Sequence, residues 1–170
     1  QLVAELANGT VQRRSQNPAD LTYFGKTKRP AAAAILDFSQ PADRLAALVK
    51  SLDFGRYENP VTLPKLRTAN KVVAVPEIDV LDRASTQPAG TITAVSPLTI
   101  TTATNDVVLP TLRKFNGKPI TPAELGLSVG QTLPRYDEDT QAALTTLHQT
   151  FAKHDGFWHP MDTLRDKNHL

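Results

Sequence analysis

The chain has 170 residues, 40% hydrophobic and 21% charged, which is typical of a globular protein rather than a disordered one. The formal net charge of +2 is too small to indicate the concentrated basic face of a strong nucleic-acid binder. No cysteine is present, which excludes disulfides and thiolate chemistry, and no apolar run approaches the roughly 20 residues that cross a bilayer. We therefore expect a cytoplasmic protein with one ordinary domain and a tail.

The first predicted element is a short helix that Asn8-Gly9 would end. The start of the chain has no initiating Met and no signal-peptide pattern. We interpret residues 1–15 as the end of a preceding catalytic domain that is missing here. The apolar residues spaced like one face of this helix are Leu2, Val3, Leu6 and Ala7.

Residues 16–70 are predicted to form a connector with one helix and an ordered loop. Ser39 is expected to cap a helix over residues 40–52, with Pro41 in its first turn, where a missing N–H costs nothing. Residues 56–66 contain two prolines and are expected to be the ordered loop. The buried stripe of the helix is predicted to be Leu45, Leu48, Val49 and Leu52.

From residue 71 the pattern changes to short segments rich in Thr, Val and Ile. Asn105-Asp106 is expected to be a two-residue hairpin turn, and residues 121–125 a short helix. The pattern of residues 71–134 predicts a small barrel or sandwich. Strands are expected at residues 72–75, 78–81, 91–95, 98–104, 107–112 and 129–133.

Residues 135–170 are predicted to be a helix and a linker to a following domain. Asp137 or Asp139 can cap a helix that continues to about Lys153. Phe157 and Trp158 in the tail are expected to anchor it to a neighbouring domain, because an exposed Trp commonly marks an interface.

The ionisable residues suggest neither a metal site nor a catalytic group. The four histidines are separated by 6, 5 and 10 positions, so no pair has the spacing that places two ligands on one helical face. Ser39 has no nearby His that could activate it, and Asp37 is expected to brace the N-terminus of the following helix. No glycine pattern predicts a phosphate-binding loop.

Several short motifs occur along the chain in a characteristic order. The motifs are Gln16, Tyr23-Phe24-Gly25-Lys26, Leu36-Asp37-Phe38-Ser39, Pro41-Ala42, Val49-Lys50-Ser51 and Ala89-Gly90-Thr91-Ile92. Together they resemble the C-terminal region of formyltransferases similar to methionyl-tRNA formyltransferase and the sugar-amine formyltransferases.

A narrower resemblance covers about residues 1–160. The stretch LVKSLDFGRYENPVTLPKL and the later word His154-Asp155-Gly156-Phe157-Trp158 are similar to formyltransferase-like domains fused to nonribosomal peptide synthetase modules. The chain departs from the wider family at Lys26 and Thr27, where sugar enzymes often have two arginines, and at Phe38, which replaces Trp.

The resemblance implies an α+β fold, with a small OB-like β-barrel flanked by helices. It implies an accessory subdomain of an enzyme that transfers a formyl group from 10-formyltetrahydrofolate to an amine. The family's catalytic Asn, His and Asp belong to a preceding Rossmann-like domain, and nothing here matches them. No cofactor is expected on this segment itself, and the implied partners are that catalytic domain, a following synthetase domain and a carrier protein.

A basic and aromatic group in the connector has two interpretations. It can be solvated charge with packed aromatic rings. It can also be a docking site for a phosphate, supplied by a carrier protein's phosphopantetheine arm or a nucleotide-linked sugar. Its residues are Tyr23, Phe24, Lys26, Lys28 and Arg29, with Arg13 and Arg14 nearby.

Two other functions stay open. The chain can be a structural or linker domain of a megasynthase that has lost formyl transfer. It can also be an oligonucleotide-binding module, since small barrels of this kind bind nucleic acid. The small net charge and the 6% aromatic content speak against the second of these.

Overall fold

The computed structural model describes residues 2–11, 15, 17–20, 27–55, 57 and 59–153. Helix α1 (Leu2–Ala7) is the predicted first helix. It ends as expected, because Gly9 takes a left-handed φ of 64° and the Thr10 N–H donates to the Glu5 carbonyl at 2.9 Å. A 3-10 turn, η1 (Pro18–Asp20), follows in the same part of the chain.

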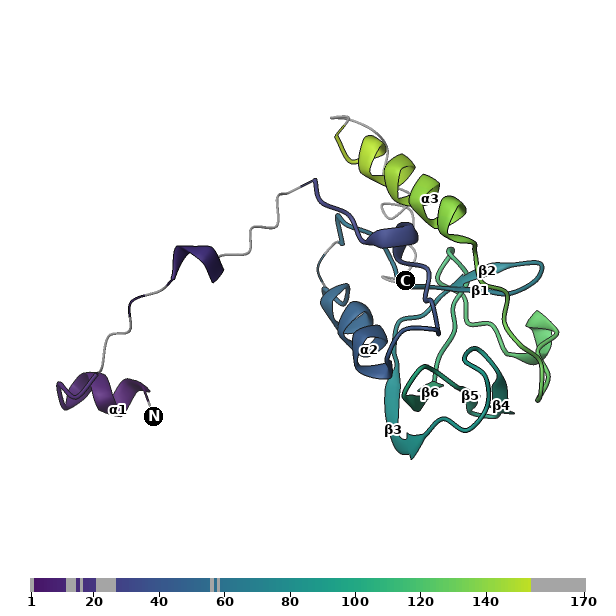
Figure 1. The fold of residues 1–170 in the computed structure, drawn as a ribbon, viewed down its shortest axis with the longest axis horizontal. Coiled ribbons are helices and arrows are strands. Elements are labelled where there is room, and N and C mark those ends of the chain that lie inside the picture. The colour runs from purple at the N-terminus through teal and green to yellow at the C-terminus, as the bar shows by residue number, and fades with distance from the viewer. Residues whose placement is uncertain are drawn as a thin grey trace.

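Two antiparallel sheets form the centre of the body shown in Figure 1. The smaller sheet pairs β1 (Lys65–Arg67) with β2 (Val72–Ala74), and the larger has the strand order β3-β6-β5-β4. The fold class is therefore α+β, as expected, but the two sheets do not close into a barrel within the described residues. The larger sheet consists of β3 (Asp79–Ala84), β4 (Ile92–Val95), β5 (Leu98–Ile100) and β6 (Asn105–Leu109).

Backbone pairing outside the named strands links the two sheets. Ala74 of β2 and Arg113 exchange two N–H···O bonds of 2.8 and 3.0 Å, so the chain leaving β6 runs on to the edge of the small sheet. At the β4 edge of the large sheet, the Ile92 N–H donates to the Gln131 carbonyl at 2.9 Å, so this bond adds the later segment to the large sheet. The predicted last strand over residues 129–133 is not a named strand, but it pairs along the β4 edge. The Gly130 and Leu133 N–H groups donate to the carbonyls of Ile92 and Gly90 at 2.8 and 2.9 Å, and Thr132 forms a bridge with Thr91.

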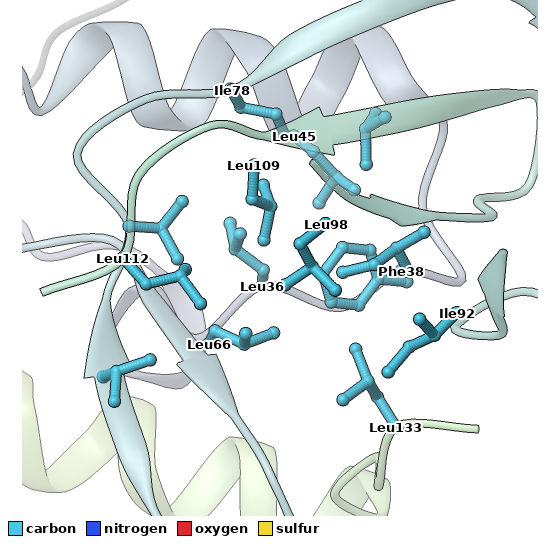
Figure 2. Packing of buried hydrophobic residues seen from close by; sticks show 14 of the residues in the cluster. Leu36, Phe38, Leu45, Leu66, Ile78, Ile92, Leu98, Leu109, Leu112 and Leu133 are labelled. Atoms are coloured by element: carbon cyan, nitrogen blue, oxygen red, sulfur yellow. The ribbon is translucent and has the colours of Figure 1, made fainter. Parts of the chain in front are cut away.

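One hydrophobic core contains side chains of both the connector and residues 71–134, which we call the β unit (Figure 2). Leu36 and Phe38 come from the connector, yet they pack in the same cluster as Ile92 and Leu98 of the large sheet. Each fully buried side chain of this size stabilises the fold by about 1.5–3 kcal/mol. The remaining labelled members are Leu45, Leu66, Ile78, Leu109, Leu112 and Leu133.

Helix α2 (Ala42–Ser51) confirms the predicted connector helix, and Leu45 and Val49 of its expected stripe are buried. The predicted Ser39 cap is wrong. Pro41 occupies the N-cap position, and the Ser39 hydroxyl instead donates to Asp37 Oδ1 at 2.7 Å. The Ala42 N–H is satisfied from a distant loop, because it donates to Thr104 Oγ1 at 3.0 Å.

The predicted hairpin turn at Asn105-Asp106 is also wrong, since both residues lie in β6. The Asp106 carboxylate is buried and accepts hydrogen bonds from Arg83 Nε at 2.9 Å and from Ser85 Oγ at 2.6 Å. These partners make an inward acidic residue tolerable in a strand. The chain turns earlier, where the Thr104 N–H donates to the Thr102 hydroxyl at 3.1 Å.

The remaining elements mostly agree with the pattern. The predicted strands from residue 72 to residue 112 each overlap one of β2 to β6, but the predicted loop over residues 56–66 ends in β1. The 3-10 helix η3 (Ala123–Leu125) lies in the predicted short helix. Helix α3 (Glu138–Phe151) begins as expected after Asp137, whose carboxylate accepts from the Thr140 N–H at 2.7 Å. Among the helices described here, none has the length and apolar character needed to cross a membrane.

Candidate functional site

Of the basic and aromatic group in the connector, the structure describes Lys28 and Arg29. Lys28 is exposed. Arg29 is half-buried, and its Nη2 donates to the Pro60 carbonyl at 3.3 Å, so its side chain lies against the ordered loop. The other predicted site residues lie outside the described part of the chain: Arg13, Arg14, Tyr23, Phe24, Lys26, Phe157 and Trp158.

The connector after Arg29 contains a left-handed turn built entirely from alanine. Ala32, Ala33 and Ala34 have φ values of 46°, 53° and 61°. For a residue with a Cβ atom this conformation costs roughly 1–2 kcal/mol relative to the right-handed form. Ala32 and Ala34 are buried, so surrounding contacts must hold the turn in place.

Two side chains far away in sequence supply these contacts. Thr145 Oγ1 of α3 accepts a hydrogen bond from the Ala32 N–H at 2.8 Å. Lys65 of β1 donates from Nζ to the Ala33 carbonyl at 2.6 Å, and its own carbonyl accepts from the Leu36 N–H at 2.9 Å. The turn is therefore fixed between α3 on one side and β1 on the other.

The Lys65 ammonium is enclosed by neutral oxygen atoms. Besides Ala33 O, it donates to Thr62 Oγ1 at 2.8 Å and to Leu63 O at 2.9 Å, which uses all three of its protons. Burial lowers the pKa of Lys65 to about 8, because the surroundings solvate the charge less well than water does. Lys65 is thus an internal cation that holds β1, the alanine turn and the loop at residues 62–63 together.

Gln149 extends the same contact along α3. Its Oε1 accepts from the Arg29 N–H at 3.0 Å, and its Nε2 donates to the Thr27 carbonyl at 2.6 Å. Thr145 and Gln149 are four residues apart, so both lie on one face of the helix. We call this assembly the connector junction: Thr27, Arg29, Ala32–Ala34, Lys65, Thr145 and Gln149.

A small pocket lies beside the connector junction. At its rim Arg135 Nε donates to Asp37 Oδ2 at 3.1 Å, and the Arg67 guanidinium stacks 3.7 Å from the centre of the Tyr136 ring. The volume of the pocket is about 60 Å³, whereas sites for drug-sized ligands usually measure about 300–1,000 Å³. The pocket is large enough for ordered water and too small for a folate-sized molecule.

Asp37 therefore has a role that its sequence position predicted only in part. It accepts from the Ser39 N–H at 3.1 Å and the Ser39 hydroxyl, which shapes the turn before α2, and it also pairs with Arg135 before α3. No group of three His, Asp or Glu side chains that could hold a metal occurs in the described residues. The polar groups of the junction bind one another and the backbone, so the arrangement positions chain segments.

The sequence signal for the junction was weak. Thr145 and Gln149 look like ordinary polar residues of an exposed helix, and Lys65 like the end of a loop.

Comparison with known proteins adds no further guide: no protein-family model matches the chain, and no curated protein resembles it significantly.

Proposed function

We propose that this chain is the C-terminal accessory region of a formyltransferase-type domain, within a cytoplasmic nonribosomal peptide synthetase. The parent enzyme would transfer a formyl group from 10-formyltetrahydrofolate to an amine. The ordered motifs of the connector support this assignment. The Leu36-Asp37-Phe38-Ser39 motif supports it further, because Leu36 and Phe38 lie in the core, Asp37 pairs with Arg135, and Ser39 bonds Asp37 in the turn before α2.

The observation that carries the proposal is the double hydrogen bond of Gln149. It ties α3 to Thr27 and Arg29, 122 and 120 positions earlier in the chain. The segment that leads into the β unit and the helix that leads out of it are therefore held together. Such a clasp would set the spacing between a catalytic domain before residue 27 and a synthetase domain after residue 153.

We further propose that residues 71–134 form an OB-like unit. The bonds between Ala74 and Arg113 join the segment after β6 to the small sheet, and the bond between Ile92 and Gln131 extends the β4 edge of the large sheet, which supports a barrel-like relationship. In this role the unit would form a wall beside the acceptor site, and Lys28 with its basic neighbours would receive the phosphate of a carrier arm.

An enzyme assay tests the proposal. Formyl transfer from 10-formyltetrahydrofolate would be measured with the parent enzyme, with the parent lacking residues 27–153, and with the parent carrying Gln149→Ala. We expect the deletion to lower turnover or acceptor affinity. Gln149→Ala should lower the same quantity less, because it removes only the Gln149 hydrogen bonds to Thr27 and Arg29 and leaves the core intact. Unchanged turnover and acceptor affinity in the deletion would refute an accessory role.

The second candidate is a purely structural linker in a megasynthase without formyl transfer. The small pocket and the internally satisfied junction favour it. A parent protein without formyl transfer, whose downstream domain nevertheless loses activity when the junction is broken, would select this function.

A further inference from the structure

A largely apolar groove lies where β6 leaves the large sheet, and none of its lining residues belongs to the connector junction. Its volume is about 270 Å³, which is several times that of the pocket at the junction. Its lining includes Pro97, Leu98, Leu109, Leu112, Pro119 and Ile120. We call it the proline groove.

The floor of the proline groove is part of the hydrophobic core. Leu98, Leu109 and Leu112 are each less than 5% exposed, and Figure 2 shows them packed together. The groove is therefore backed by rigid packing, and a side chain placed in it would contact a surface that is already ordered.

A basic hairpin of residues 113–118 rises directly from the edge of this groove, since Leu112 and Pro119 line the groove on either side of it. The Lys114 N–H donates to the Lys118 carbonyl at 2.8 Å, and Arg113 Nη1 donates to the Gly117 carbonyl at 3.0 Å. Gly117, with a left-handed φ of 80°, closes the tip. These bonds hold the hairpin in a defined shape.

The hairpin gathers positive charge around one exposed aromatic ring. Phe115 is 43% exposed, and Lys114 and Lys118 of the same hairpin are exposed as well. Lys71 lies next to the same region, because its Nζ donates to the Glu124 carbonyl at 3.3 Å. With Arg113, this end of the molecule carries four cations, whereas the whole chain has a net charge of only +2.

The Glu124 carboxylate lies near these four cations. It can neutralise only one of their four positive charges. Glu124 accepts from the Thr121 N–H at 2.8 Å and the Thr121 hydroxyl at 3.0 Å, an N-terminal capping arrangement for η3. These hydrogen bonds, and then the charges of Lys114 and Lys71, lower the pKa of Glu124. Its carboxylate is committed to the turn of the chain itself.

We propose that the proline groove and the basic hairpin together form a docking surface for an acidic, amphipathic segment of a partner protein. An apolar side chain of that segment fills the groove and packs against Phe115, while its carboxylates approach Lys114 and Lys118. An aromatic anchor with a charged rim is a common arrangement at protein interfaces. The surface is separate from the connector junction and independent of the proposed formyltransferase role.

Single-stranded nucleic acid fits the same surface less well. Proteins that bind it usually present several aromatic platforms along a basic track. Here the hairpin carries a single aromatic ring, Phe115, and the neighbouring groove is lined mainly by prolines and aliphatic side chains. An apolar groove beside a cationic hairpin matches a partner that carries both apolar and acidic side chains.

The test is a titration of the full chain, followed by the amide resonances of the isotope-labelled protein. The probe is a helical peptide of about four turns with leucines on one face and glutamates elsewhere. A peptide with the same composition in scrambled order and a peptide with lysine in place of glutamate serve as comparisons. We expect the acidic amphipathic peptide to shift resonances of residues 95–98 and 109–122, and added salt to weaken its binding.

Substitutions assign the binding to the hairpin. The double substitution Lys114→Glu with Lys118→Glu should lower the affinity for the acidic peptide by about tenfold, because two attractions become repulsions. The matched control is Arg44→Glu with Lys50→Glu, which reverses two exposed charges on α2 and should leave the affinity unchanged. Phe115→Ala keeps every charge and should also weaken binding, so the apolar contact is tested separately.

Several results would overturn the proposal. They are an absence of shifts, shifts confined to other surfaces, and equal binding of the lysine or scrambled peptide. Tighter binding of a single-stranded oligonucleotide to the hairpin would assign the surface to nucleic acid instead. Concentration-dependent self-association that disappears in the hairpin variant would assign it to a second copy of this chain.

Discussion

The Nζ atom of Lys65 lies 2.6 Å from the carbonyl oxygen of Ala33, the middle residue of a left-handed turn of three alanines. A charged group in β1 therefore holds a strained conformation of the connector. The strain and the buried charge are both unfavourable when taken alone. They persist together because the ammonium satisfies three oxygen atoms that would otherwise lie buried without donors.

Replacing Lys65 with methionine should destabilise the protein. The substitution removes the cost of burying a charge, but it leaves the acceptors at Ala33, Leu63 and Thr62 without their donor, and each unsatisfied group costs about 1–3 kcal/mol. We expect a net loss of about 2 kcal/mol in the free energy of unfolding, measured by urea denaturation at pH 7. Lys28→Met, at an exposed lysine, is the control and should change stability little.

The same lysine predicts an unusual dependence on pH. Its pKa is about 8 in the folded protein and near 10.5 when unfolded, so the unfolded state binds more protons between these values. The contribution of Lys65 to stability should therefore rise with pH across that window, by at most about 3 kcal/mol. Comparing wild type with Lys65→Met from pH 7 to pH 10.5 isolates this contribution, and parallel curves would show that the pKa is not lowered.

Relief of the alanine turn should stabilise the fold. Glycine accepts a left-handed φ without penalty, so Ala33→Gly should gain about 0.5–1 kcal/mol after its extra chain entropy in the unfolded state is counted. Ala33 suits this test because its side chain is not fully buried, and little packing is lost. Ala31→Gly, at the exposed residue just before the left-handed turn, should destabilise instead, and thermal unfolding of both variants gives the sign.

The Gln149 clasp should be visible in hydrogen exchange. Gln149→Ala removes both bonds to the connector, and we expect faster exchange of the amides of residues 29–34 while the β5 and β6 amides keep their protection. Thr146→Ala alters an exposed neighbour on the same helix and controls for any change in α3 itself. If exchange in the connector is equal in the two variants, Gln149 does not hold the segments together.

The ion pair of the large sheet gives a separate prediction. Asp106 is buried while the Arg83 side chain is 60% exposed, so removing the cation leaves a carboxylate in the sheet with Ser85 as its remaining side-chain donor. We expect Arg83→Met to lower the free energy of unfolding by about 2–3 kcal/mol. Asp82→Asn, at an exposed position on the same strand, should have little effect in the same denaturation experiment.

Local patterns were sufficient to predict much of the fold. The short runs rich in Thr, Val and Ile predicted β2 to β6, and the apolar stripe predicted α2, whose Leu45 and Val49 are buried. The errors at Ser39 and at Asn105-Asp106 have a common physical cause. In both places the local preference lost to a distant partner, since Thr104 receives the Ala42 N–H and Arg83 neutralises Asp106.

The connector junction could not be predicted from local sequence patterns, for a different reason. Alanine has no preference for the left-handed region, so nothing in the run of four alanines from Ala31 to Ala34 indicates a left-handed turn. Its conformation is imposed by Lys65 and Thr145, which lie 32 and 113 positions away from the residues they bind. The same separation hides Gln149, whose spacing from Thr145 suggests only a helical face.

The Thr104 cap has a consequence for how the protein is made. Helix α2 leaves the ribosome 62 residues before the hydroxyl that satisfies its first amide exists, and that hydroxyl is positioned by the turn between β5 and β6. The first amide of the helix can gain this hydrogen bond only when the turn that carries Thr104 is in place. The hydrogen bond at the start of α2 therefore reports whether the turn between β5 and β6 has reached its final position.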